Sequence, residues 1–261
     1  MFSAVQAVAS SSYREFVVRL DEVSSTAPEF VVHLPITTKN ERIPTLVFFH
    51  GMRPRDLAKR TPFIASALSE SLASRGWAVV YPQLPGHLVE LPSDADSSKH
   101  FCEVHGNVGT AVDEARQQAH LVEVFLANMP LLDKNVVFAG HSRGGALALL
   151  VGSLSNTHRG VINFSGGWVG GGCHNFSAVN SSLLTTAANS DKLTLWIYGD
   201  NDSIFSMRDI AQMLMAYTKA GGRAMLLVKS TGAQNDHALF NYRQHWSEAL
   251  TFYLTEVTKD R

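Results

Sequence analysis

The sequence predicts an α/β protein with a mainly parallel central sheet, helices on both faces and an antiparallel leading strand pair. Short continuous apolar runs recur along the chain, as in strands that are buried on both faces of a parallel sheet. Segments with the apolar spacing of helices separate these runs, as in βαβ units. No linker rich in Pro, Gly or Ser divides the 261 residues, so residues 13–261 are predicted to form a single domain.

The leading pair of strands is predicted from two segments in which apolar and polar residues alternate, Arg14–Leu20 and Glu29–Leu34. Ser24, Ser25 and Pro28 lie between them, which favours a turn and an antiparallel pair. The continuous apolar runs that predict the parallel strands are Thr45–Phe49, Ala78–Tyr81, Val136–Ala139, Val161–Phe164, Leu193–Tyr198 and Ala224–Val228.

Helices are predicted between these strands. Thr61 and Pro62 form a cap and first-turn pair for the first helix, which ends before Gly76, and Gly221-Gly222 ends the fourth. The predicted helices are Thr61–Ser74, Val108–Asn128, Ser142–Leu154, Met207–Lys219 and Tyr242–Val257. The loops at the carboxyl ends of the strands are therefore where the chemistry is expected, because open α/β sheets bind ligands there.

The composition excludes several classes of protein. Hydrophobic residues make up 45% of the chain and charged residues 17%, which rules out a disordered protein. The 22 Lys and Arg nearly balance the 23 Asp and Glu, so no global field attracts nucleic acid or an anionic membrane. No stretch approaches the roughly 18 apolar residues of a membrane-spanning helix. The sequence makes no prediction of oligomeric state.

Residues 1–12 are predicted to be a flexible N-terminal tail. Ala7-Val8-Ala9 before Ser10 has the small residues that end an export signal, whereas residues 1–6 supply no basic start and no apolar core. Two interpretations stay open, the remnant of an export signal and an ordinary loose tail, and the compartment stays open with them.

The segment Val136–Gly145 is the most informative in the chain. It contains G-x-S-x-G at Gly140, Ser142 and Gly144, after a predicted strand and before a predicted helix. A serine on such a tight strand-to-helix turn exposes its hydroxyl, and the helix N-terminus adds free N–H groups. The alternatives are a phosphate-binding turn, whose motifs are missing here, and a plain βα turn. We therefore predict that Ser142 is a nucleophile.

A serine hydroxyl needs a histidine to take its proton and a carboxylate to orient that histidine. In this arrangement the chain order is serine, acid, histidine. His237 follows the last predicted parallel strand and is the predicted base, ahead of His158, His174 and His245. Asp200 and Asp202 both follow the strand before it. Asp202 is the preferred acid because it lies three residues beyond Gly199 and reaches further, whereas Asp200 is the alternative.

An oxyanion hole needs two N–H donors. The first is predicted at Arg143, directly after the nucleophile. The second is predicted at Met52 in Phe49-His50-Gly51-Met52, where Gly51 lets the backbone approach the substrate. The alternative for this segment is a simple strand end.

Four segments together resemble the α/β-hydrolase superfamily, and within it the dienelactone hydrolase-like branch. They are Phe49-His50-Gly51, Gly140-His141-Ser142-Arg143-Gly144-Gly145, Leu195-Trp196-Ile197-Tyr198-Gly199-Asp200-Asn201-Asp202 and Asp236-His237-Ala238-Leu239-Phe240. The resemblance extends from Thr45 to Val257. It implies the α/β-hydrolase fold with Ser142 as nucleophile, Asp202 as acid and His237 as base.

The nucleophile departs from the dienelactone hydrolases proper, which use a cysteine. The chain is more similar to the exported serine relatives of the branch, which carry a Cys before the long helix and another in the Gly-rich loop. Cys102 and Cys173 occupy these two places, so the resemblance implies a disulfide between them and favours a periplasmic or secreted protein. Without the resemblance, two buried thiols are the simpler interpretation.

The substrate pocket is predicted from fewer signals. Trp168 lies in the Gly-rich segment Gly166–Gly172, where it could line a mobile pocket wall or cap the core. His50, Gly51 and His141 are the other candidate pocket residues. The spacing His100-x-Cys102-x-x-His105 suggests metal ligands, but no second cluster completes a set of four, so no metal is expected.

The predicted function is a serine hydrolase that cleaves a carboxylic ester or related acyl substrate through an acyl-enzyme. Its expected partner is a small-molecule acyl compound, and no cofactor is expected. The alternatives are a peptidase, thioesterase or acyltransferase on the same three residues, and a ligand-binding homologue without catalysis.

Overall fold

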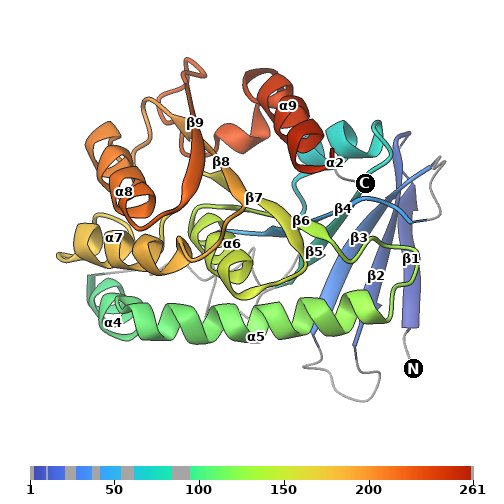
Figure 1. Cartoon of the computed structure of the whole chain (residues 1–261), viewed down its shortest axis with the longest axis horizontal. Helices are drawn as coiled ribbons and strands as arrows, with labels where there is room; N and C mark the ends of the chain where they lie inside the picture. The colour runs from blue at the N-terminus through green and yellow to red at the C-terminus, as the bar shows by residue number, and fades with distance from the viewer. Residues whose placement is uncertain are drawn as a thin grey trace.

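A computed structural model describes residues 3–9, 11–20, 28–36, 42–53, 62–83 and 95–259, and it is built around one sheet (Figure 1). The strands are β1 (Ser3–Ala9), β2 (Tyr13–Arg19), β3 (Glu29–Pro35), β4 (Thr45–Phe49), β5 (Ala78–Pro82), β6 (Val136–His141), β7 (His158–Phe164), β8 (Leu193–Gly199) and β9 (Arg223–Lys229). The six continuous apolar runs each coincide with one of the strands from β4 to β9, as predicted.

The strands of the described residues follow the order β1-β2-β3-β5-β4-β6-β7-β8-β9. Neighbours from β5 to β9 pair in parallel, whereas β1, β2 and β3 are antiparallel to their neighbours. The β4–β6 register places Phe49 beside Gly140, and the β6–β7 register places His141 beside Phe164. The carboxyl ends of the parallel strands therefore share one edge, as expected for an α/β sheet.

The structure corrects the prediction of a flexible tail over residues 3–9. Residues 3–9 form the edge strand β1, which pairs with β2 from Ser3 opposite Arg19 to Ala9 opposite Arg14. Strand β2 would otherwise present a row of unpaired N–H and C=O groups, and the added strand satisfies them. The antiparallel part of the sheet thus has a third strand beside the predicted pair.

Helices cover both faces of the sheet. They are α2 (Ser66–Ala73), α4 (Ala95–His105), α5 (Val108–Ala127), α6 (Arg143–Leu154), α7 (Phe176–Ala187), α8 (Met207–Lys219) and α9 (Ser247–Val257), with short 3-10 turns η1 (Leu239–Asn241) and η2 (Arg243–His245). Helices α5, α6, α7 and α8 pack into one apolar cluster, and α2 and α9 pack into a second cluster on the other face. Within the described ranges, no helix combines the length and apolar character that a membrane span needs.

Several predicted helix boundaries are wrong. The helix predicted over Thr61–Ser74 corresponds to α2, which begins at Ser66. Thr61 lies outside the described residues, and Pro62 is not helical. Helices α4 and α7 lie in segments for which no helix was predicted. Both contain Ser residues, which favour turns when no tertiary contact opposes them, and α7 is held by buried apolar residues such as Leu183 and Leu184.

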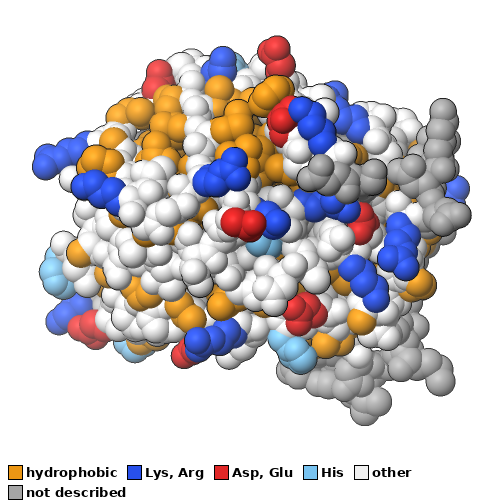
Figure 2. All heavy atoms as spheres, in the orientation of Figure 1, with side chains coloured by type: hydrophobic (Ala, Val, Ile, Leu, Met, Phe, Trp, Pro, Cys, Tyr) orange, Lys and Arg blue, Asp and Glu red, His pale blue; other side chains and the backbone are white. Residues whose placement is uncertain are grey.

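Strand β9 differs from the other parallel strands. It was expected to be buried on both faces, but it forms the sheet edge, and Leu226 is 39% exposed. Figure 2 shows hydrophobic side chains gathered on this part of the surface. Before β9, Gly221 has φ +100° directly after the end of α8, so the predicted helix stop at Gly221 is confirmed.

Candidate active site

Ser142 lies on the tight turn between β6 and α6. Its backbone has φ 55° and ψ −127°, a region that L-residues rarely adopt, and its N–H donates to the Phe164 carbonyl across 2.9 Å. A Cβ at Gly140 would overlap the Gly144 carbonyl, and one at Gly144 would overlap the Phe49 carbonyl. The two glycines therefore let strand and helix approach closely enough to hold the strained serine at the sheet edge.

His237 connects the serine to a carboxylate. It lies in the loop after β9, and its Nε2 is 3.0 Å from Ser142 Oγ. Its Nδ1 lies 2.9 Å from Oδ2 and 3.0 Å from Oδ1 of Asp202. Since a carboxylate accepts, Nδ1–H is the donor to Asp202 and Nε2 is left to accept the serine proton. The three residues chosen from the sequence thus meet within hydrogen-bond distance.

Asp202 is held in place by backbone N–H groups of the residues that follow it in its loop. Its Oδ1 accepts hydrogen bonds from the N–H of Ile204 at 2.8 Å and of Phe205 at 3.1 Å. Burial raises the pKa of the Asp202 carboxyl, but the hydrogen bond and charge of His237 and these N–H groups lower it, and the net pKa lies below its usual value. The alternative acid, Asp200, has an exposed side chain, and its N–H donates to the Lys229 carbonyl.

Hydrogen bonds join the loop that carries Asp202 to the loop that carries His237. The N–H of Asp236 donates to the Asn201 carbonyl at 3.0 Å, and Asn201 Nδ2 donates to the Gln234 carbonyl at 2.9 Å. The N–H of Ser203 donates to Asn235 Oδ1 at 3.1 Å. The Asp236 carboxylate turns away from the site and accepts from Thr231. Sequence reasoning missed these links, because they join segments about thirty residues apart.

The two candidate oxyanion donors both border the same cavity as Ser142. Arg143 is the first residue of α6, so its N–H has no carbonyl of its own helix to bond. The N–H of Met52 has no acceptor among the residues that the structure describes. A Cβ at Gly51 would overlap Ser142 Cβ, which explains the glycine before Met52.

His50 is buried beside the serine, whereas His141 is half-buried and borders the same cavity as Ser142. Burial lowers the pKa of His50 to about 4. Burial, with the nearby His237, lowers the pKa of His141 to about 3. Both rings are therefore neutral at pH 7. His50 Nδ1–H donates to the Gly51 carbonyl at 2.9 Å, whereas His141 Nε2–H donates to the His237 carbonyl at 2.9 Å.

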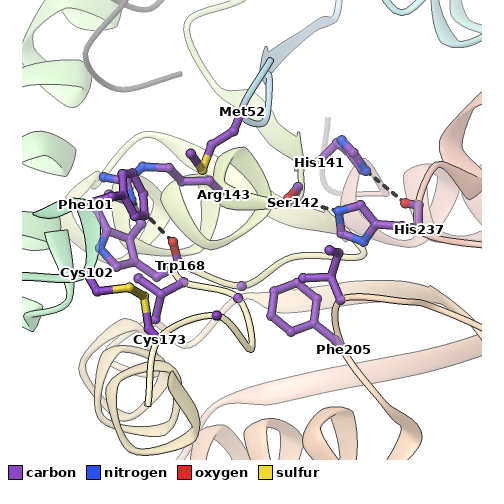
Figure 3. Close-up of a pocket in the computed structure, with 15 residues that line it drawn as sticks. Met52, Phe101, Cys102, His141, Ser142, Arg143, Trp168, Cys173, Phe205 and His237 are labelled. Atoms are coloured by element: carbon purple, nitrogen blue, oxygen red, sulfur yellow. Dashed lines mark hydrogen bonds between the residues drawn. A yellow bond between two sulfur atoms is a disulfide. The ribbon is translucent and has the colours of Figure 1, made fainter. Parts of the chain in front are cut away.

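A cavity of about 320 Å³ opens beside Ser142 (Figure 3). Trp168 lines it and is only 1% exposed, so the tryptophan belongs to both the pocket wall and the core. The wall is fixed in place: Asn180 Oδ1 accepts from the N–H of Trp168 at 2.7 Å, and Trp168 Nε1 donates to the His105 carbonyl at 2.8 Å. Cys102 and Cys173 form a disulfide at the same wall, as the resemblance implied.

The Arg143 side chain forms a buried ion pair that the sequence did not predict. Its Nη2 donates to both carboxylate oxygens of Glu114 at 3.0 Å, and its guanidinium lies 3.5 Å from the centre of the Trp168 ring. Burial lowers the pKa of Arg143 to about 10 against the opposing effect of Glu114, so the guanidinium is charged at pH 7. The sequence shows only a Glu in the predicted helix that precedes the Ser142 turn.

No group of three or more His, Cys, Asp or Glu in the described part of the chain is arranged to hold a metal ion. The Cys of the His100-x-Cys102-x-x-His105 spacing is occupied by its disulfide.

The sequence matches the alpha/beta hydrolase family over residues 46–261. The chain belongs to this family, and the predicted α/β-hydrolase fold is confirmed. No curated protein matches the sequence.

Solved structures share the fold at low sequence identity. The acylaminoacyl peptidase of Pyrococcus horikoshii is 15% identical with a TM-score of 0.66, and the match covers 95% of this chain but 42% of the peptidase. A putative dienelactone hydrolase from Klebsiella pneumoniae is 12% identical with a TM-score of 0.63, covering 97% and 99% of the two chains. Acetyl xylan esterase 1 from Thermoanaerobacterium sp. is 15% identical with a TM-score of 0.62, covering 98% and 88%. The chain thus spans less than half of the peptidase but nearly all of the other two.

Proposed function

We propose that this protein is a serine hydrolase that cleaves a carboxylic ester or related acyl substrate on Ser142, His237 and Asp202. The observation that carries the proposal is the continuous hydrogen-bonded chain from Ser142 Oγ through both His237 nitrogens to Asp202, at 3.0 and 2.9 Å. A hydroxyl becomes an effective nucleophile when a base with this geometry takes its proton.

In the first half of the reaction, Ser142 Oγ attacks the substrate carbonyl carbon while its proton moves to His237 Nε2. The carbonyl oxygen becomes an oxyanion, which the N–H groups of Met52 and Arg143 bind. His237 then donates the proton to the leaving alcohol oxygen as the carbon–oxygen bond breaks. Asp202 stabilises the positively charged imidazole during these steps.

In the second half, His237 Nε2 takes a proton from water, and the resulting hydroxide attacks the acyl-enzyme carbonyl. The same N–H groups bind the second oxyanion. The proton returns to Ser142 Oγ as the ester bond to the serine breaks, and the carboxylic acid leaves.

A fluorophosphonate probe tests the nucleophile directly. We expect covalent labelling at Ser142, seen by mass spectrometry of the peptide, and no labelling of Ser142→Ala. Ser203→Ala is the matched control, because Ser203 is an exposed serine in the acid-bearing loop, and it should label like the parent protein. A folded parent protein that is not labelled would instead support a ligand-binding homologue.

A second experiment separates the possible acyl substrates. p-Nitrophenyl esters, acyl thioesters and aminoacyl amides with a matched acyl group are compared by kcat/KM. We expect the ester to be cleaved fastest. A faster amide would identify a peptidase, and a faster thioester a thioesterase.

A further inference from the structure

We infer that the cavity beside Ser142 binds the acyl group of the substrate and selects acyl groups that are apolar, uncharged and of short to medium length. This inference rests on the proposed function and names the substrate class of the same site. Three features carry it: the position of the cavity relative to His237, the neutralised charge at its wall, and its size.

The position of His237 decides which end of the substrate enters the cavity. In Figure 3, Ser142 lies between the His237 imidazole on one side and Phe101, Trp168 and the disulfide on the other. The leaving alcohol must lie next to His237, because Nε2 protonates it. The acyl group therefore extends the opposite way, towards Phe101 and Trp168.

The walls at this end are mostly apolar. The side chains that form them belong to Phe101, Trp168, Val169 and Ile204, with the Cys102–Cys173 disulfide. Because the disulfide joins α4 to the Gly-rich loop and Asn180 holds that loop by its backbone, the wall is formed before the substrate binds.

Arg143 is the one Lys, Arg, Asp or Glu among the described residues that line the cavity. Its guanidinium lies next to the rings of Trp168 and Phe101. It is therefore the cation with which a carboxylate on the acyl group would form an ion pair. Glu114 already takes this charge with both carboxylate oxygens. An anionic acyl group would meet Glu114 as a like charge and would lose its water without gaining an ion pair. The pocket therefore discriminates against it.

The volume limits the length of the acyl group. At about 320 Å³ the cavity is at the low end of the roughly 300–1,000 Å³ that small-molecule sites occupy. A short to medium acyl chain or a single aromatic ring fits this space, whereas a long lipid chain extends beyond the walls.

The test keeps the alcohol constant and varies the acyl group. p-Nitrophenyl acetate, butyrate, hexanoate and dodecanoate report length, and mono-p-nitrophenyl succinate reports charge against p-nitrophenyl pentanoate. We expect kcat/KM to peak at butyrate or hexanoate, to fall at least tenfold for dodecanoate, and to be at least 100-fold lower for the succinate than for the pentanoate.

Two variants locate the selectivity. Phe101→Ala should raise the dodecanoate to hexanoate ratio at least tenfold, whereas Phe252→Ala, which removes a ring 54% exposed on α9, should leave it unchanged. Glu114→Gln should raise the succinate to pentanoate ratio at least tenfold by freeing Arg143. Since Phe101 is half-buried, Phe101→Leu serves if Phe101→Ala does not fold.

The outcomes separate this inference from the proposed function. Labelling at Ser142 with acetate hydrolysis, but equal rates for the succinate and the pentanoate or an unchanged length profile in the Phe101 variants, overturns the pocket inference and leaves the hydrolase. Absence of labelling and of hydrolysis of every ester overturns both.

Discussion

His141 Nε2–H donates a hydrogen bond across 2.9 Å to the main-chain carbonyl of His237. Since a carbonyl can only accept, the proton of the neutral His141 ring must be on Nε2. The residue directly before the predicted nucleophile thus holds the backbone of the predicted base, and the ring centres of the two histidines are 4.9 Å apart. His141 acts through His237, and we regard it as a positioning residue.

Replacing His141 should affect turnover more than substrate binding. In His141→Ala the loop of His237 loses this bond and a packed ring, and a small displacement of a catalytic group lowers the rate by about 100-fold. In His141→Gln the amide N–H is close to the position of Nε2 and should restore most of the loss. The measurement is kcat and KM on a neutral p-nitrophenyl ester. A His141→Ala protein that keeps the parent kcat would show that this bond does not position the base.

Asp202 and Asp200 form a matched pair of carboxylates for testing the acid. Asp202→Asn removes the charge that stabilises protonated His237 and should lower kcat by about 10⁴-fold, as in other serine triads. Asp200→Asn changes an exposed side chain in the same loop and should leave kcat within a few-fold of the parent. Equal losses in the two variants would mean that the loop as a whole, rather than the Asp202 carboxylate, supports the reaction.

Gly144 should tolerate no side chain. A Cβ there would overlap the main-chain carbonyls of Phe49 and His50, which cannot move without separating α6 from the sheet. We expect Gly144→Ala to lose more than about 4 kcal/mol of unfolding free energy, or to fail to fold. Gly171→Ala is the control, because a Cβ at Gly171 meets no atom within 4 Å. Urea denaturation of the two variants and the parent measures the difference, and similar midpoints for all three would contradict the close approach.

The Cys102–Cys173 disulfide should stabilise the fold. It closes a loop with a sequence separation of 71, and a loop of this length corresponds to about 4 kcal/mol of lost unfolded-state entropy. The double variant Cys102→Ser with Cys173→Ser should therefore unfold at lower urea concentration. Dithiothreitol should lower the midpoint of the parent and not of the double variant. If the reductant shifts both midpoints equally, its effect does not come from this bond.

Stability should fall in mild acid. His50 and His141 have pKa values lowered to about 4 and about 3 by burial, against 6.5 for an ordinary histidine, so protons bind the unfolded chain more tightly. Their contribution is complete above pH 6.5 and is lost as the pH falls towards these folded values. At pH 5 the free energy of unfolding should therefore be lower than at neutral pH by about 2 kcal/mol for each histidine.

Urea denaturation at pH 7.5 and pH 5 measures this loss. His141→Gln carries no titrating group at position 141, so its stability should depend less on pH over the same interval, by about 2 kcal/mol. The same pH dependence in the variant and the parent would rule out His141 as a source of the acid sensitivity.

Local patterns were enough to predict much of this protein. The apolar runs identify six strands because strands buried on both faces need continuous apolar residues. The tight turn at Ser142 could be recognised because Gly140 and Gly144 are needed wherever a strand and a helix meet this closely. His237 and the two candidate aspartates followed from their positions after successive strands, since those positions share one edge of the sheet.

Other features depend on contacts between segments far apart in the chain, and no local pattern records them. The sequence preferred Asp202 to Asp200 only by its reach, and the tertiary structure shows the contact itself: Asp202 lies against His237 and accepts from the Ile204 and Phe205 N–H groups. The tertiary structure alone pairs Arg143 with Glu114, and it places residues 3–9 in the sheet, where an unpaired strand edge is available. Periodicity and turn chemistry act between neighbouring residues and can be seen in the sequence, whereas pairing and burial are decided when distant segments pack together.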